Sequence, residues 1–241
     1  MSSVKPDRNA EDVARAAALL EEHEQFCTEL ADGLHALAQP LTILRSAIAM
    51  LALSKEDGTA GERYLSMSMR QIERTCQLFS SVQGLLAAKM VPAERETIDI
   101  GSVLRQVIND HSQAVEARGI DLIAASFKSS GMVFGDRRRT ELAIAAAFET
   151  AVSVSSAGDV IKVDASPSDG LLEISFESTG GLDNIVTSLD RLNVSLARTN
   201  ILSQQGQYQF TQEPFRISLA LPACQHALEK SGTTCCPVFT S

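Results

Sequence analysis

The chain has 241 residues, of which 44% are hydrophobic, and it contains 14 glycines and no tryptophan. This length is sufficient for one or two domains with buried cores. The formal net charge of -9 argues against nucleic acid as a partner, because nucleic-acid-binding proteins normally present a basic face.

No membrane segment is expected, since no apolar run of about eighteen residues stands out and Met1 to Ala10 is polar. We therefore predict a cytoplasmic protein without a signal peptide or anchor. The basic run Arg137-Arg138-Arg139 is interpreted as a solvated helix start. No metal or other cofactor is predicted: Cys235 and Cys236 lack metal-ligand spacing, and His111 and His226 have no carboxylate or cysteine at such spacing.

A long helix is predicted from Asn9 or Ala10 to about Leu53. Its apolar or small residues recur in steps of three and four, which is a heptad repeat. The repeat consists of Leu20, Cys27, Leu30, Leu34, Leu37, Leu41, Leu44, Ile48 and Leu51, with His23 in the one gap, where a polar residue sets register. Pro40 predicts a kink near Ala36 or Leu37. His35 follows Leu34 by about 100 degrees around the helix, which predicts a solvent-accessible imidazole beside the repeat.

A second helix is predicted after a loop over Ser54 to Gly61. It has a similar repeat, made of Leu65, Met69, Ile72, Cys76, Phe79, Val82 and Leu86. One hairpin cannot bury both apolar faces, so we predict a homodimer in which two hairpins form a four-helix bundle. Cys27 and Cys76 are interpreted as small apolar members of these faces.

The periodicity changes after Pro92, and Val91 to Glu96 is predicted to be a linker. The predicted strands are 98–100, 120–124, 132–134, 160–163, 171–176, 208–210 and 215–221, and the predicted helices are 103–117, 140–154 and 189–204. This order predicts an α+β protein, with one layer of helices on a mostly antiparallel sheet. The predicted parts are a helical hairpin over 10–91, an α/β sandwich over 97–222 and a polar tail over 223–241.

The run His35-Ala-Leu-Ala-Gln-Pro-Leu-Thr42 resembles the H-box of sensor histidine kinases, and the elements from about Ala10 to Leu221 resemble the hairpin and ATP-binding domain of that family. The resemblance implies that His35 carries phosphate on a ring nitrogen. The alternative is a helix-flank histidine without chemistry. Ala36 departs from the family, which has an acidic residue there that makes the imidazole a better nucleophile.

Helical spacing and the resemblance suggest roles for other residues around His35. Asp32 or Glu29, one turn earlier, could partly replace the missing acid. Gln39 lies on the same face as His35, where the family places a group that orients water; a solvated flank residue is the equal alternative. Arg45 is a candidate for positioning phosphate or pairing with receiver acids. The predicted docking face consists of Leu34, Ala38, Gln39, Leu41 and Arg45.

The nucleotide motifs of the family are missing where the resemblance places them. Asp136 opens a helix as in the family, but Thr150 stands at the Mg²⁺-binding asparagine and Ala146 at an earlier one. Ser178 replaces the aspartate that binds adenine, ahead of Gly180 and Gly181. The stretch Leu192 to Asn200 has no glycine for a phosphate lid. We interpret Gly180-Gly181 as a turn, and expect neither ATP binding nor self-phosphorylation.

The main hypothesis is a histidine phosphotransferase of a two-component phosphorelay, in which His35 exchanges a phosphoryl group with aspartates of response-regulator receiver domains. The receiver would supply Mg²⁺. A second hypothesis, which Ala36 favours, is a non-catalytic module that docks on a response regulator or a histidine kinase and inhibits it. A third is a divergent kinase, which requires ATP binding.

Overall fold

A computed structural model describes residues 8–53, 58–124, 131–180 and 187–224. The chain divides into two compact units, Met1–Leu78 and Phe79–Ser241. The division falls inside a helix, and the last turns of that helix belong to the second unit. His226, Cys235, Cys236 and most of the predicted tail lie outside the described residues.

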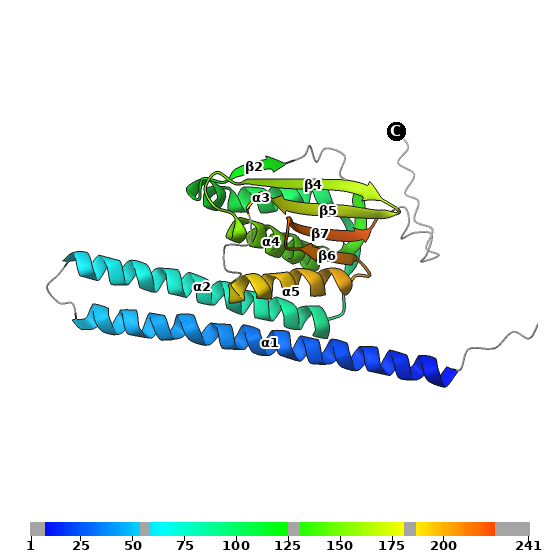
Figure 1. The fold of residues 1–241 in the computed structure, drawn as a ribbon, viewed down its shortest axis with the longest axis horizontal. Helices are drawn as coiled ribbons and strands as arrows, with labels where there is room; N and C mark the ends of the chain where they lie inside the picture. The colour runs from blue at the N-terminus through cyan, green and yellow to red at the C-terminus, as the bar shows by residue number, and fades with distance from the viewer. Residues whose placement is uncertain (1–7, 54–57, 125–130, 181–186, 225–241) are drawn as a thin grey trace, which may run out of the picture. The chain divides into compact units, whose positions relative to one another are not determined.

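The first unit contains helix α1 (Arg8–Leu53) and most of helix α2 (Gly58–Met90), which form a helical hairpin (Figure 1). The long helix is therefore confirmed, and it continues through Pro40. The predicted loop over Ser54 to Gly61 is too long, because α2 already begins at Gly58. Gly61 lies in contact range of Leu51, since a Cβ on it would be 3.9 Å from a Leu51 methyl group.

Small residues form the buried line of α1. Gly33, Pro40 and Ala47 are buried and lie seven residues apart. The next residue in each case is a large apolar one, and Leu34, Leu41 and Ile48 are 54%, 49% and 52% exposed. The buried residues of α1 therefore lie one position before the predicted repeat residues Leu34, Leu41 and Ile48, which are not covered within the hairpin.

The expectation that no stretch is long and apolar enough to cross a membrane is wrong for one part of α1. His23–Ala52 is long and apolar enough for a span by length and composition alone. The core helix of a soluble protein can have the same length and composition. The cytoplasmic location remains a prediction.

The second unit is an α/β sandwich, in which a five-stranded sheet has the order β2-β4-β5-β7-β6. All its neighbours are antiparallel except β2 and β4. Strands β1 and β3 pair separately, antiparallel. The strands are β1 (Arg95–Asp99), β2 (Asp121–Ala124), β3 (Met132–Asp136), β4 (Val160–Ser168), β5 (Leu171–Ser178), β6 (Gln207–Thr211) and β7 (Phe215–Pro222). The predicted mostly antiparallel sheet is confirmed.

Three helices, α3 (Ile100–Ala117), α4 (Arg137–Val154) and α5 (Ser188–Leu202), form a layer beside this sheet (Figure 1). The core lies between the layers: Phe148 of α4 and Phe176 of β5 are fully buried, with ring centroids 6.1 Å apart. Ile100 was predicted to end a strand but begins α3, because Asp99 accepts a hydrogen bond from the Gly101 amide and caps the helix.

Candidate functional site

The side chain of His35 is exposed on α1. Asp32, three residues before it, and Gln39, four residues after it, are also exposed and share its helix face. Among the described residues, the imidazole has no hydrogen-bond or ion-pair partner. A ring nitrogen of His35 is therefore accessible to a reactant from outside the chain.

The other predicted docking residues lie at the surface of the same helix. Leu34, Ala38, Leu41 and Arg45 are exposed, whereas Ala36 is half-buried. Pro40 has no N–H to donate to the Ala36 carbonyl, so the backbone hydrogen-bond ladder is interrupted one residue after His35. The Thr42 hydroxyl donates to the Ala38 carbonyl at 2.8 Å. The structure thus places all the predicted H-box residues on one accessible helix.

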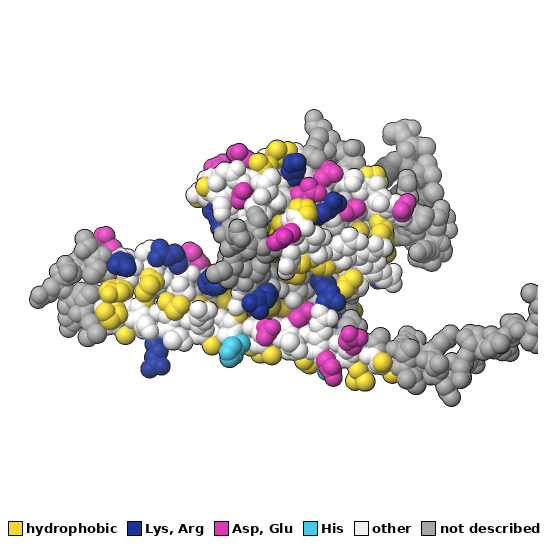
Figure 2. Space-filling model, in the orientation of Figure 1, with side chains coloured by type: hydrophobic (Ala, Val, Ile, Leu, Met, Phe, Trp, Pro, Cys, Tyr) yellow, Lys and Arg dark blue, Asp and Glu magenta, His cyan; other side chains and the backbone are white. Residues whose placement is uncertain are grey.

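The exposed apolar line of α1 has a counterpart on α2. Leu65, Met69 and Ile72 are 54%, 51% and 42% exposed, and Cys76 is exposed next to them. Figure 2 shows hydrophobic side chains exposed along both helices of the hairpin. Cys27 is exposed on α1 and lies 3.7 Å from the His23 ring nitrogen Nε2. Both cysteines are thus members of the apolar faces, as predicted.

The residues at the expected metal-binding position are engaged within the fold. Asp136 caps α4 by accepting a hydrogen bond from the Arg139 amide, as predicted from its place in the sequence. Thr150 is buried, and its hydroxyl donates to the Ala146 carbonyl at 2.8 Å. Ala146 is itself buried and apolar. Neither residue provides the amide with which an asparagine would hold Mg²⁺ and phosphate.

Ser178, at the expected adenine-binding position, also has internal partners. Its hydroxyl lies 2.7 Å from the Ser155 hydroxyl and accepts from the Gly180 amide at 3.0 Å. A Cβ on Gly180 would lie 2.6 Å from Asp159 Oδ2 and 3.0 Å from the Val154 carbonyl. A side chain at position 180 would therefore meet Asp159 and Val154 on one side, while Gly180 also borders a groove.

Helix α5 contains the stretch Leu192 to Asn200, which was compared with a phosphate lid. Thr187 and Asp190 form a capping box at the start of α5. Leu192, Leu196 and Ala197 are buried. Residues 181–186, including Gly181, lie outside the described residues. The stretch itself is a packed helix, in agreement with its lack of glycine.

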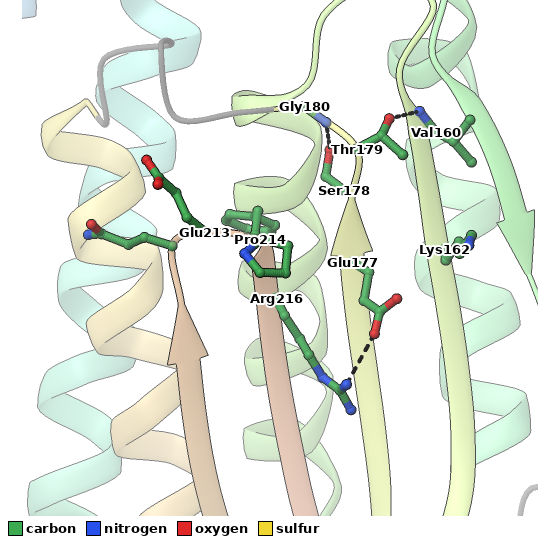
Figure 3. A pocket seen from close by; sticks show the side chains of 11 residues that line it. Val160, Lys162, Glu177, Ser178, Thr179, Gly180, Glu213, Pro214 and Arg216 are labelled. Carbon is green, nitrogen blue, oxygen red and sulfur yellow. Dashed lines mark hydrogen bonds and ion pairs between the residues drawn. The ribbon is translucent and has the colours of Figure 1, made fainter.

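A groove of about 480 Å³ lies on the other side of β5. Side chains alternate along a strand, so Glu177 faces away from the helices while Phe176 and Ser178 face them. Figure 3 shows Lys162, Glu177, Pro214 and Arg216 along this groove. Arg216 pairs with Glu177 at 3.2 Å. The groove is also lined by Ser178, Thr179 and Gly180, so it extends to the residues at the expected adenine-binding position.

A buried ion pair between Asp136 and Arg139 lies at the start of α4, and the sequence analysis did not predict it. Arg139 is 8% exposed, and its guanidinium lies 3.6 Å from the Asp136 carboxylate. It also donates to the Ser203 hydroxyl at 2.9 Å and to the Val91 carbonyl. The interpretation of all three arginines as solvated is thus wrong for Arg139, whereas Arg137 and Arg138 are exposed.

A second polar network joins four helices. His111 of α3 lies 3.1 Å from one carboxylate oxygen of Glu149, and Asn193 of α5 donates to the other at 3.0 Å. Ser81 of α2 donates to the Asn193 side-chain oxygen at 3.2 Å. His111 was set aside because its neighbours in sequence offered no ligand, but Glu149 comes from another helix. No signal in the sequence identified this pair.

The pH dependence of stability should report the His111–Glu149 contact. The hydrogen bond to Glu149 is the main cause that raises the pKa of His111, and burial opposes it. Because the folded-state pKa is raised, the contact stabilises the fold fully below about pH 6.5, and this stabilisation is lost as pH rises through the folded-state pKa. We expect Glu149→Gln to remove this component, as measured by urea midpoints between about pH 5 and about pH 9. If the urea midpoints of the wild type and Glu149→Gln change with pH in the same way, the His111–Glu149 contact is not the source of this pH dependence.

The sequence matches no family model and no curated protein. Solved structures do match the fold. The histidine kinase AdeS of Acinetobacter baumannii is 18% identical, with 79% of this chain and 98% of that one covered and a TM-score of 0.61. ThkA, solved in complex with the response regulator protein TrrA, is 16% identical to this chain. The match covers 92% of this chain and 68% of that one, with a TM-score of 0.65. The fold is that of a histidine kinase.

This histidine-kinase fold includes both parts of the chain, the helical hairpin and the mixed α/β sandwich. Full-length ShkA, solved with AMPPNP, is a further match at 16% identity, with 83% of this chain and 46% of that one covered and a TM-score of 0.55. His35 lies on α1, the first helix of the hairpin. The positions expected to bind nucleotide lie in the sandwich.

Proposed function

We propose that the protein is a histidine phosphotransferase of a two-component phosphorelay, in which His35 exchanges a phosphoryl group with receiver aspartates and ATP-dependent self-phosphorylation is absent. The observation that carries this proposal is a contrast within one fold. His35 is exposed and without a partner among the described residues, whereas the hydroxyls of Thr150 and Ser178 are engaged in internal hydrogen bonds.

The proposed absence of self-phosphorylation is supported by the hydrogen-bonding groups at the expected nucleotide positions. Thr150 has one hydroxyl, which is already bonded to Ala146, and Ser178 is bonded to Ser155 and Gly180. Binding of adenine at Ser178 would break these buried hydrogen bonds, and an unpaired buried polar group costs about 1–3 kcal/mol. The residues therefore do not fit Mg²⁺ and ATP.

The transfer step requires only His35 from this chain. The unprotonated ring nitrogen of neutral His35 attacks the phosphorus of the receiver's aspartyl phosphate, a P–N bond forms, the P–O bond to aspartate breaks, and the proton on the other ring nitrogen can then pass to water. The receiver regains its carboxylate and supplies Mg²⁺. The reverse reaction passes the phosphoryl group to a second receiver. Asp32 lies one turn before His35 and Arg45 farther along α1, where they can contact such a partner.

A receiver domain as partner is supported by one of the matched structures. ThkA was solved with a response regulator protein, and 92% of this chain is covered by that match. Ala38 and Arg45 are exposed on α1 near His35, and Arg45 offers a positive charge for a receiver's acidic residues. Gln39 shares the face of His35 and is placed to contact the phosphoryl group.

A homodimer is the second part of the proposal, because it would cover the apolar lines of α1 and α2. We expect Leu41→Asp combined with Ile48→Asp to convert the dimer to monomer in sedimentation velocity. Burial of a Leu or Ile side chain in the interface should stabilise the dimer by about 1.5–3 kcal/mol. The double change should therefore weaken dimer association by more than about a hundredfold. The exposed neighbour Ala49 provides a control, and Ala49→Asp should leave the dimer intact. A wild type that is monomeric at all concentrations would contradict the dimer.

Ala36 favours the alternative of a non-catalytic docking module. It is half-buried and provides no acid next to His35. Such a module would bind a response regulator or a histidine kinase through the same helix and would keep its inhibitory effect when His35 is replaced.

The test is incubation of the purified chain with two phosphoryl donors in parallel. With a phosphorylated receiver domain, acid-labile and base-stable label should appear on this chain within the time of the experiment. With labelled ATP and Mg²⁺, no label and no saturable binding should appear. Label from ATP would identify a divergent kinase. Receiver binding without label would favour the docking module and would overturn the phosphotransferase.

A further inference from the structure

We infer that the linker between α2 and β1 is a fixed clasp, so that the last turns of α2 and the sandwich form one rigid body. The clasp consists of Val91 and Glu94 in the linker, Asp136 and Arg139 at the start of α4, and Ser203 after α5. This inference concerns conformation and does not depend on whether His35 accepts phosphate.

The linker is held at two backbone positions by buried side chains. Arg139 donates to the Val91 carbonyl, and Asp136 accepts from the Glu94 amide at 3.0 Å. Both side chains are largely buried, at 9% and 13% exposure. Charge-assisted hydrogen bonds of this kind are stronger than neutral ones and are poorly exchanged for water when buried. The linker backbone is therefore bonded on either side of Pro92.

Residues that follow α5 hold Asp136 and its neighbours in position through further hydrogen bonds. The Gln204 side-chain oxygen accepts from the Asp136 amide at 2.6 Å, and its side-chain nitrogen donates to the Asn200 carbonyl at 3.0 Å. The Ser203 hydroxyl donates to the same carbonyl at 2.9 Å. Gly135 has no room for a side chain, since a Cβ would lie 2.4 Å from Gln204 Oε1. The end of α5 thus fixes Asp136 and Arg139 in position.

The last turns of α2 have independent contacts with the same layer of helices. Ser81 donates to Asn193 of α5. A Cβ on Gly84 would lie 2.7 Å from a methyl group of Leu196, so α2 and α5 approach closely there. Leu85 and Ala88 are buried as well. Since contacts on both sides of Met90 join α2 and the linker to the sandwich, the linker has no freedom to act as a hinge.

Hydrogen exchange of the full chain tests the clasp. In the wild type, the peptide that spans Val91 to Glu96 should exchange as slowly as the strands of the sandwich. Arg139→Ala should accelerate exchange of this peptide by at least about tenfold, and trypsin should then cut after Arg95. Arg137→Ala is the matched control, because Arg137 lies in the same helical turn but is exposed and pairs with Glu141. It should leave both readouts unchanged.

Arg139→Lys covers the case in which Arg139→Ala does not fold. Lysine keeps the charge beside Asp136 but lacks the planar fork that reaches Val91 and Ser203 together. We expect faster exchange in the linker peptide with unchanged exchange in β5 and β7. Fast exchange of the linker in the wild type, or no effect of either Arg139 variant in a folded protein, would overturn the clasp. Because no phosphoryl transfer is measured, this result is separate from the test of the phosphotransferase.

Discussion

Replacement of His35 by glutamine is expected to abolish labelling of the chain by a phosphorylated receiver domain. Glutamine preserves a polar side chain of similar length but has no ring nitrogen that can form the P–N bond. The substituted side chain is exposed on α1, so the fold should be unaffected. The measurement is acid-labile, base-stable label on wild type and variant after the same incubation, and we expect complete loss.

His23→Gln provides the matched control for this experiment. His23 is an exposed histidine on the same helix, in contact with Cys27. Its replacement should leave labelling at the wild-type level. Equal label on His35→Gln and on wild type would exclude His35 as the acceptor, and label lost in both variants would point to damage to the helix.

Arg139→Ala should lower the free energy of unfolding by about 3–5 kcal/mol, because it leaves the buried Asp136 carboxylate without its partner. The variant also removes hydrogen bonds to Ser203 and Val91. Denaturant unfolding followed by far-ultraviolet circular dichroism provides the measurement. For a marginally stable domain, a change of this size is a large part of the total stability.

The comparison for this prediction is Arg137→Ala, which removes an ion pair with Glu141 at the helix surface. Exposed pairs between residues four apart stabilise by about 0.3–0.5 kcal/mol. If the two alanine variants unfold at similar denaturant concentrations, the Asp136–Arg139 pair does not stabilise the fold as its burial indicates.

Elements with strong local periodicity were predictable from the sequence. The three-and-four spacing from Leu20 to Leu51 located α1, and alternation along Val160–Val163 and Leu171–Phe176 located β4 and β5. The pairing of β1 with β3 and the parallel pairing of β2 with β4 connect distant segments. No local pattern contains that information, since it depends on how the helices cover the sheet.

The candidate site was predictable where a linear motif carries it. His35 and Pro40 lie five residues apart on one helix, and the accessibility of His35 follows from the repeat around it. Arg139 and His111 were misjudged for the opposite reason. Three successive arginines do not indicate which one turns inward, and the partner of His111 is 38 residues away along the chain.

The pair of hydroxyls at Ser155 and Ser178 opposes the introduction of a carboxylate at this position. A single change of Ser178 to aspartate would place a carboxylate in a buried position that now accommodates two neutral hydroxyls 2.7 Å apart. Burial of such a charge without a partner is strongly unfavourable. The Ser155–Ser178 contact thus favours neutral side chains at both positions, and a carboxylate at position 178 should reduce the stability of the fold.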